Sequence, residues 1–110
     1  MKVQDLLQLE DLTLIQEGDM EAEIIGGYMG DLLSVVMGEA GEGQAWITIQ
    51  SHVNIVAVAS LKGVPVIIIA HGFEPDAETL ENAKDEEITI LGTKLDPFSI
   101  AKKLITELNL

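Results

Sequence analysis

The chain has 110 residues, of which 47% are apolar, so a single domain spanning residues 1–110 is expected, with a hydrophobic core of its own. It contains no cysteine, which excludes a disulfide framework and thiolate metal sites. Nineteen acidic residues against six lysines, with no arginine, give a net charge of −13. This acidic balance argues against nucleic-acid binding, which requires a basic surface.

The first third of the chain is predicted to form short elements separated by turns. Val3–Gln8 is predicted to be a short helix and Leu12–Gln16 a short strand, with an acidic turn after it. A second short strand is predicted over Ala22–Ile25, ending at a glycine pair. Apolar residues are dense over Asp31–Glu39 and several glycines follow, which predicts a helix and then a loop.

The middle of the chain predicts strand, helix and strand. Ala45–Gln50 suits a strand, and Asn54–Leu61 is predicted to be a helix rich in small residues that presses against the sheet. Val64–Ala70 is predicted to be a fully buried strand, and it is the longest unbroken apolar run. That run is far too short to cross a bilayer, and no apolar stretch near Met1 is long enough for a signal peptide. A soluble cytoplasmic protein with no membrane partner is therefore expected.

The last third predicts a helix, a strand and a second helix. Pro75 begins a helix that runs to about Lys84, and Ile88–Leu91 is predicted to be a strand. The pair Asp96-Pro97 is a strong start for a final helix. The apolar stripe expected to dock this helix on the sheet consists of Ile100, Leu104, Ile105 and Leu108. In total, four or five strands alternate with four or five helices, which is typical of an α/β fold.

Candidate binding residues fall in the turns that follow the predicted strands. A strand–helix–strand crossover nearly always forms a right-handed parallel unit, and ligands collect at the carboxyl ends of parallel strands. Four turns are therefore predicted to meet at one edge of the sheet. The candidate ligand-binding residues in them are Gly26, Gly27, Tyr28, Ser51, His52, Asn54, His71, Gly72 and Thr93.

No metal ion, cofactor or catalytic residue is predicted for these turns. The glycine-rich segment 26–31 matches neither the P-loop nor the dinucleotide fingerprint, so glycines needed for backbone turning are favoured over a phosphate-binding loop. Asp31 is interpreted as a helix N-cap rather than a catalytic acid. The two histidines are too few for a metal site, and neither stands beside a nucleophile of a recognised type.

Two apolar features keep two interpretations each. The helix predicted over Asn54–Leu61 can be buried within the subunit or can serve as a self-association face. Phe73, an aromatic residue in a turn, is expected to be covered by a partner or to lie over a ligand.

Most of the chain resembles, in the order and spacing of its segments, the DRTGG domain. The segments that carry the resemblance are GGYMGDLLSVVM, WITIQSHVNIVAVASLKGVPVIII, HGFEPDAETLENA and ILGTKLDPFSIAKKL. Domains of that kind occur alone, within some bacterial phosphotransacetylases, and between the CBS modules of regulated inorganic pyrophosphatases. Their fold is related to the N-terminal domains of HPr kinase/phosphorylase and of the Mur ligases. The resemblance implies a three-layer α/β/α sandwich with a mainly parallel sheet of four to five strands, and frequent dimerisation.

The chain departs from the signature for which the DRTGG domain is named. Ser51-His52 stand where the family's Asp-Arg pair is expected, and Ala70-His71-Gly72 stand where Thr-Gly-Gly is expected, so only Gly72 is retained. A binding site that depends on those residues is changed or lost in this chain.

The resemblance and the clustered turns together favour a stand-alone regulatory module without catalytic activity. It is expected to form a homodimer and to sense a small-molecule effector or act through a partner enzyme. One alternative is a pure protein–protein interaction module that docks a basic partner on its apolar and acidic faces. The other is a small phosphotransfer-type or hydrolytic enzyme that uses His52 or His71.

Overall fold

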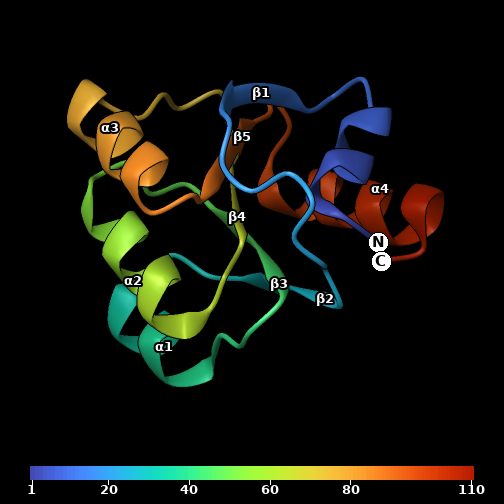
Figure 1. Cartoon of the computed structure of the whole chain (residues 1–110). Helices are drawn as coiled ribbons and strands as arrows, with labels where there is room; N and C mark the ends of the chain where they lie inside the picture. Colours follow the sequence, from blue (N-terminus) through green and yellow to red (C-terminus); the bar gives the residue numbers. More distant parts are fainter.

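A five-stranded sheet forms the middle layer of the molecule (Figure 1). The computed structural model describes residues 1–110. The strands are β1 (Thr13–Gln16), β2 (Gly26–Met29), β3 (Gln44–Thr48), β4 (Val66–Ile69) and β5 (Thr89–Gly92). Their order across the sheet is β1-β5-β4-β3-β2, with β2 to β5 parallel and β1 antiparallel to β5. The mainly parallel sheet of the predicted fold class is therefore confirmed.

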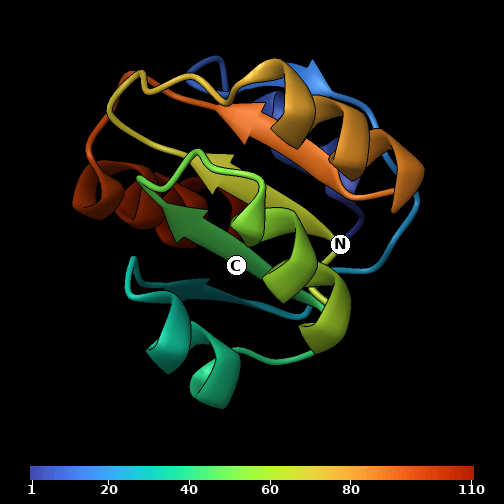
Figure 2. The same cartoon turned by 90° about the vertical axis from the view of Figure 1, so that its left-hand side faces the viewer.

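Helices cover both faces of the sheet, which completes the predicted three-layer α/β/α sandwich (Figures 1 and 2). One face carries the 3₁₀ helix η1 (Val3–Gln8) and the long helix α4 (Pro97–Leu108). The other face carries α1 (Leu33–Glu39), α2 (Asn54–Lys62) and α3 (Ala77–Asp85). None of these helices is long and apolar enough to span a bilayer.

The central strand β4 divides the hydrophobic core into two halves. Val66 and Ile68 belong to the half that η1 and α4 cover, whereas Ile67 and Ile69 belong to the half under α1, α2 and α3. All four side chains are fully buried. Alternate residues of a strand point to opposite faces, so the unbroken apolar run is explained by burial on both sides, as expected for a parallel sheet covered by helices.

The helix boundaries in the second half of the chain follow from capping. Asp76 and Asp96 each accept a hydrogen bond from the backbone N–H three residues later, at the start of α3 and α4. Pro97 occupies the first position of α4. Gly63 ends α2 with a φ of 71°, a left-handed conformation that glycine adopts without steric cost.

The second strand lies further along the chain than the sequence predicted. The prediction over Ala22–Ile25 is wrong, because the ladder with β3 begins at Gly26 and runs to Met29. The backbone amide of Ile24 instead donates to the Met1 carbonyl, at 2.7 Å. Gly26, Gly27 and Tyr28 are therefore strand residues, and the turn predicted for them does not exist.

The role predicted for Asp31 is also wrong. Helix α1 begins at Leu33, and its N-cap position is Leu32, which makes no side-chain cap. Asp31 lies one residue too early to cap it. Its Oδ1 atom accepts hydrogen bonds from Thr48 Oγ1 and from the Ile49 amide, both at 2.9 Å. Asp31 thus ties the β2–α1 connection to the end of β3.

Two apolar segments pack differently from each other. Ile100 and Leu104 of α4 are buried and Leu108 is half-buried, but Ile105 is 61% exposed, so the expectation that Ile105 docks on the sheet is wrong. In α2, Ile55, Val56, Val58 and Ala59 are buried within the subunit. Burial inside the subunit accounts for most of the apolar residues that α2 contains.

Candidate functional site

Three of the four predicted turns do meet at one edge of the sheet. Because β3, β4 and β5 are parallel and adjacent, the segments that follow them begin side by side. These segments contain Ser51-His52 after β3, His71-Gly72 after β4, and Thr93 after β5. Gly26, Gly27 and Tyr28 do not join them, because β2 contains all three.

The connections after β4 and β5 leave the sheet on opposite faces. The chain turns from β4 to α3 on one face and from β5 to α4 on the other (Figure 2). The earlier crossovers through α1 and α2 lie on the same face as α3. Adjacent parallel strands whose connections diverge leave a crevice between them, and ligands of open α/β sheets bind in such crevices.

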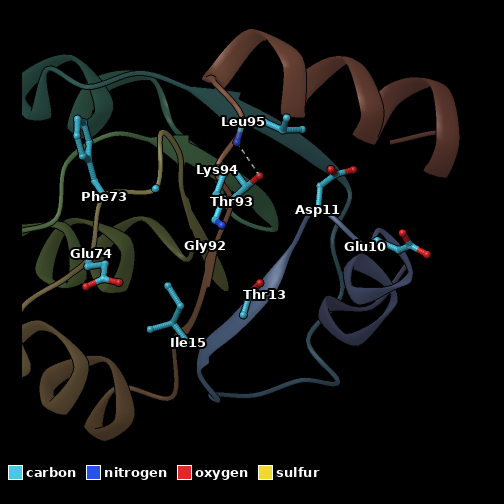
Figure 3. Close-up of a pocket in the computed structure, with 11 residues that line it drawn as sticks. Glu10, Asp11, Thr13, Ile15, Phe73, Glu74, Gly92, Thr93, Lys94 and Leu95 are labelled. Carbon is cyan, nitrogen blue, oxygen red and sulfur yellow. Dashed lines mark hydrogen bonds between the residues drawn. The ribbon is translucent and has the colours of Figure 1, made fainter.

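A cavity of about 490 Å³ occupies this position (Figure 3). A volume of this size is in the range of small-molecule sites. One wall is formed by the segments after β4 and β5, and the other by the end of the η1–β1 connection and by β1. The lining residues are Glu10, Asp11, Thr13, Ile15, Gly72, Phe73, Glu74, Gly92, Thr93, Lys94 and Leu95.

The floor of the cavity is formed by the ends of β4 and β5, which are joined by backbone hydrogen bonds. The His71 amide donates to the Leu95 carbonyl at 2.9 Å, and the Gly72 amide donates to the Thr93 carbonyl at 2.8 Å. His71 and Gly72 have φ values of 62° and 69°, so this junction is a tight turn in left-handed conformation. Thr93 is 5% exposed, and its Oγ1 accepts a hydrogen bond from the Leu95 amide at 3.2 Å.

Few backbone amides of this floor remain available to a ligand. Those of residues 70 to 73, 93 and 95 all donate within the protein, which leaves those of Glu74 and Lys94. The N-termini of α3 and α4, which otherwise attract anions, are capped by Asp76 and Asp96.

Carboxylates outnumber bases around the cavity. Glu10, Asp11 and Glu74 line it, with Lys94 as the single base among its lining residues. Asp11 points toward α4 (Figure 3) and accepts a hydrogen bond from Lys103 Nζ at 2.7 Å. This bond raises the pKa of Lys103 above its usual value. The Glu10 side chain points away from the other labelled side chains (Figure 3).

Hydrogen bonds also shift the pKa of the two capping carboxylates nearby. The Ser99 backbone amide donates to Asp96 Oδ1 at 2.6 Å and holds the pKa of Asp96 below its usual value. The Thr79 hydroxyl and amide, at 2.7 and 2.9 Å, lower the pKa of Asp76 in the same way. Both groups therefore carry negative charge at neutral pH, at the ends of helices that flank the strand ends.

An exposed aromatic pair lies at the mouth of the cavity. Phe73 is 49% exposed, and its ring centroid is 5.9 Å from that of His71, with the planes tilted by 40°. Phe73 lines the cavity, so a flat or cationic ligand group placed there would have an aromatic face to pack on.

The predicted site residues thus fall into three separate places. Gly72 and Thr93 line the cavity, and His71 lies beside it. Ser51, His52 and Asn54 lie at the β3–α2 junction, where the Ser51 carbonyl accepts a hydrogen bond from Thr79 Oγ1 at 3.0 Å. Gly26, Gly27 and Tyr28 lie in the edge strand; Gly27 and Tyr28 line a second, apolar hollow against α4.

The lining residues before and in β1 could not be placed from sequence. Thr13 and Ile15 reach the cavity because β1 pairs antiparallel with β5, with Thr13 opposite Gly92. The Ile15 side chain lies so close over Gly92 that a Cβ atom there would sit 2.6 Å from Ile15 Cδ1. Because residue 92 is glycine, the Ile15 side chain of β1 can pack directly over β5 at the cavity wall.

No group of three or more histidine, aspartate or glutamate side chains is arranged to hold a metal ion. The hydrogen bond made by Trp46 has a structural role. Trp46 is buried and donates from Nε1 to the Gly30 carbonyl at 2.9 Å, so it fills the core and fastens the end of β2.

Neither family models nor curated protein sequences match this chain. Among solved structures, the chain is similar to the CBS and DRTGG domains of the regulatory region of Clostridium perfringens pyrophosphatase, crystallised with its activator, diadenosine tetraphosphate. The TM-score is 0.70 at 19% sequence identity; the match covers 92% of this chain and 44% of that one. The chain thus spans less than half the length of that neighbour, and the likeness establishes a fold of the DRTGG/CBS type.

Proposed function

We propose that this chain is a DRTGG-type regulatory module that binds a small molecule in the cavity at the ends of β4 and β5. The cavity carries the proposal, because it lies where the connections diverge and has the volume of a small-molecule site. Residues 1–110 are proposed to form one domain that acts without catalysis. Two copies of this domain are proposed to form a homodimer. The similar regulatory region binds an activator, which supports a role in sensing.

The chemistry of the cavity favours a neutral or cationic ligand. Three carboxylates and one lysine line the cavity, although Asp11 is paired with Lys103 and Glu10 points away, and most amides of its floor already donate within the protein. A protein site that binds an anion generally needs free N–H donors or basic side chains. We therefore expect this cavity to disfavour a polyphosphate such as the activator of the similar regulatory region.

The position of the cavity suggests how binding would be transmitted. One wall belongs to the N-terminal segment, including Thr13 and Ile15, and the other to the ends of β4 and β5. A ligand that contacts both walls favours the arrangement in which they are close. Such a ligand regulates only to the extent that it binds one arrangement better than another.

A thermal-shift screen of metabolites tests the proposal. Neutral and amine-bearing compounds form one arm and nucleotides the other. A ligand present at about 100 times its dissociation constant should add about 2.7 kcal/mol to the free energy of unfolding. Phe73→Ala should remove most of the shift, because Phe73 offers an exposed aromatic face at the cavity.

His52→Ala is the matched control, because His52 is exposed near the same edge of the sheet but does not line the cavity. The shift should survive this substitution. If His52→Ala abolishes the shift and Phe73→Ala preserves it, the ligand binds at the end of β3 and the cavity is not the site.

A further inference from the structure

Most of the strongly exposed apolar side chains belong to the edge strand β2 and to the helices α1 and α4. Of the eight most exposed large apolar side chains, six belong to β2, to the residue before it, or to α1 with its N-cap and α4, while Leu61 and Phe73 lie elsewhere. The six are Ile25, Met29, Leu32, Val35, Phe98 and Ile105, called here the β2-edge face. Large apolar patches on soluble proteins mark interaction sites.

These side chains come from elements that flank one open strand. β2 is the last strand of the sheet and pairs only with β3. Helix α1 covers one face beside it, and α4 lies on the other (Figures 1 and 2). Between β2 and α4 is a hollow of about 310 Å³, to which Met29 and Ile105 contribute. Phe98 stands seven residues before Ile105 on α4, so both lie on the same stripe of that helix.

Nothing inside the subunit requires the two residues Gly26 and Gly27 of β2 to be glycine. Gly26 and Gly27 do not have positive φ values, so their backbone is open to other residues. A Cβ atom on Gly26 would meet nothing within 4 Å, and one on Gly27 would make only ordinary contacts. Glycine weakens a strand, and it often marks a bulge, a tight bend, or a place where a ligand or another backbone approaches closely.

Charge is nearly absent from the same stretch. Residues 24 to 38 contain one charged residue, Asp31, whereas the whole chain contains nineteen acids and six bases. Asp31 already accepts two hydrogen bonds within the protein. Two copies of a chain with a net charge of −13 repel each other, and residues 24 to 38 contribute only one charge to that repulsion. Charges more than about 10 Å apart are largely screened at moderate ionic strength.

We propose that the β2-edge face binds a second copy of this chain, with β2 pairing antiparallel to its own copy across a two-fold axis. The proposal refines the homodimer of the proposed function by assigning its interface. An edge strand presents unpaired N–H and C=O groups, and a two-fold axis brings identical edges together in opposite directions. The glycines then keep side-chain bulk away from the seam, and the flanking apolar residues of α1 and α4 cover it.

The test is the mass in solution, measured by sedimentation velocity or by light scattering on a sizing column. Wild-type protein at micromolar concentrations should have twice the monomer mass. Met29→Lys should give monomers, because it places a charge in the seam. Gly26→Val should also give monomers, because it adds bulk beside the seam, and it should keep the fold, since a Cβ atom at position 26 meets nothing within 4 Å inside the subunit. Circular dichroism melting checks that both variants stay folded.

Leu61→Lys is the matched control, because Leu61 is equally apolar and 74% exposed but belongs to α2. It should remain dimeric. Added salt should strengthen dimerisation by screening the repulsion between the acidic copies. A monomeric wild type, dimeric Met29→Lys and Gly26→Val proteins, or dissociation by Leu61→Lys would each overturn the proposal.

The ligand screen is repeated on the Gly26→Val monomer. Position 26 does not line the cavity, so a thermal shift that persists in a monomer separates the ligand site from the interface. The proposed interface is thereby tested independently of the proposed ligand site.

Discussion

Replacing Asp31 by alanine is expected to lower the free energy of unfolding by about 2 kcal/mol. The substitution removes the acceptor for Thr48 Oγ1, a hydroxyl on a fully buried residue, and hydrogen bonds to charged groups contribute about 1.5–3 kcal/mol. The Ile49 amide also loses its acceptor, but that amide is near solvent and finds water. The melting temperature should fall by roughly 8 °C for a domain of this size.

Two further variants identify the cause. Asp31→Asn keeps an oxygen in the place of Oδ1 and should recover much of the loss. Thr48→Val removes the hydroxyl, so the double variant Asp31→Ala with Thr48→Val should be less destabilised than the sum of the single variants. Chemical denaturation at equilibrium measures all four proteins. If the effects add, or if Asp31→Asn is as unstable as Asp31→Ala, the hydrogen bond to Thr48 is not the reason.

Two other substitutions test the core and the helix caps. Ile68→Ala should cost about 2–5 kcal/mol by denaturant unfolding, because Ile68 is fully buried in the central strand and its removal leaves a cavity; a loss below about 1 kcal/mol would contradict burial of this side chain under η1 and α4. In the Asp96→Asn variant, the melting temperature should fall less steeply than in the wild type as the pH drops below about 4. The folded pKa of Asp96 is lowered, so its contribution is present above the unfolded carboxyl value of about 3.9 and is lost as the pH falls through the folded pKa. If the melting temperature of the variant falls as steeply with pH as that of the wild type, protonation of Asp96 does not contribute to the loss of stability in acid.

Periodicity and capping signals were sufficient to predict most elements of the fold. The run Val64–Ala70 predicted a strand buried on both sides, and the Asp96-Pro97 pair predicted the start of α4; both are confirmed. The error over Ala22–Ile25 arose because a short segment with two isoleucines, followed by a glycine pair, looks like a strand that ends at a turn, whereas the pairing ladder begins at Gly26. Glycine disfavours strands by local propensity, and here tertiary pairing overrode it.

The candidate site was only partly predictable, because strand order is not visible in a sequence. Parallel order placed Gly72 and Thr93 correctly at one edge. The opposite wall depends on β1 inserting beside β5 in the reverse direction, which brings Thr13 close to Gly92 across nearly eighty positions of the chain. No local pattern predicts such a neighbour. The exposure of Ile105 was missed because a helical stripe shows which residues share a side, and not how much of that side the sheet covers.

Both chain ends lie beside β2. The Met1 carbonyl accepts a hydrogen bond from Ile24, and the Leu110 side chain reaches within 3.9 Å of where a Cβ atom of Gly27 would be. A purification tag or fused partner at either terminus would therefore emerge next to the seam proposed for two copies. Fusions joined by short spacers should dimerise less readily than fusions joined by long ones. In a larger polypeptide that carried this domain, the segments attached at either end would be brought together when two copies pair.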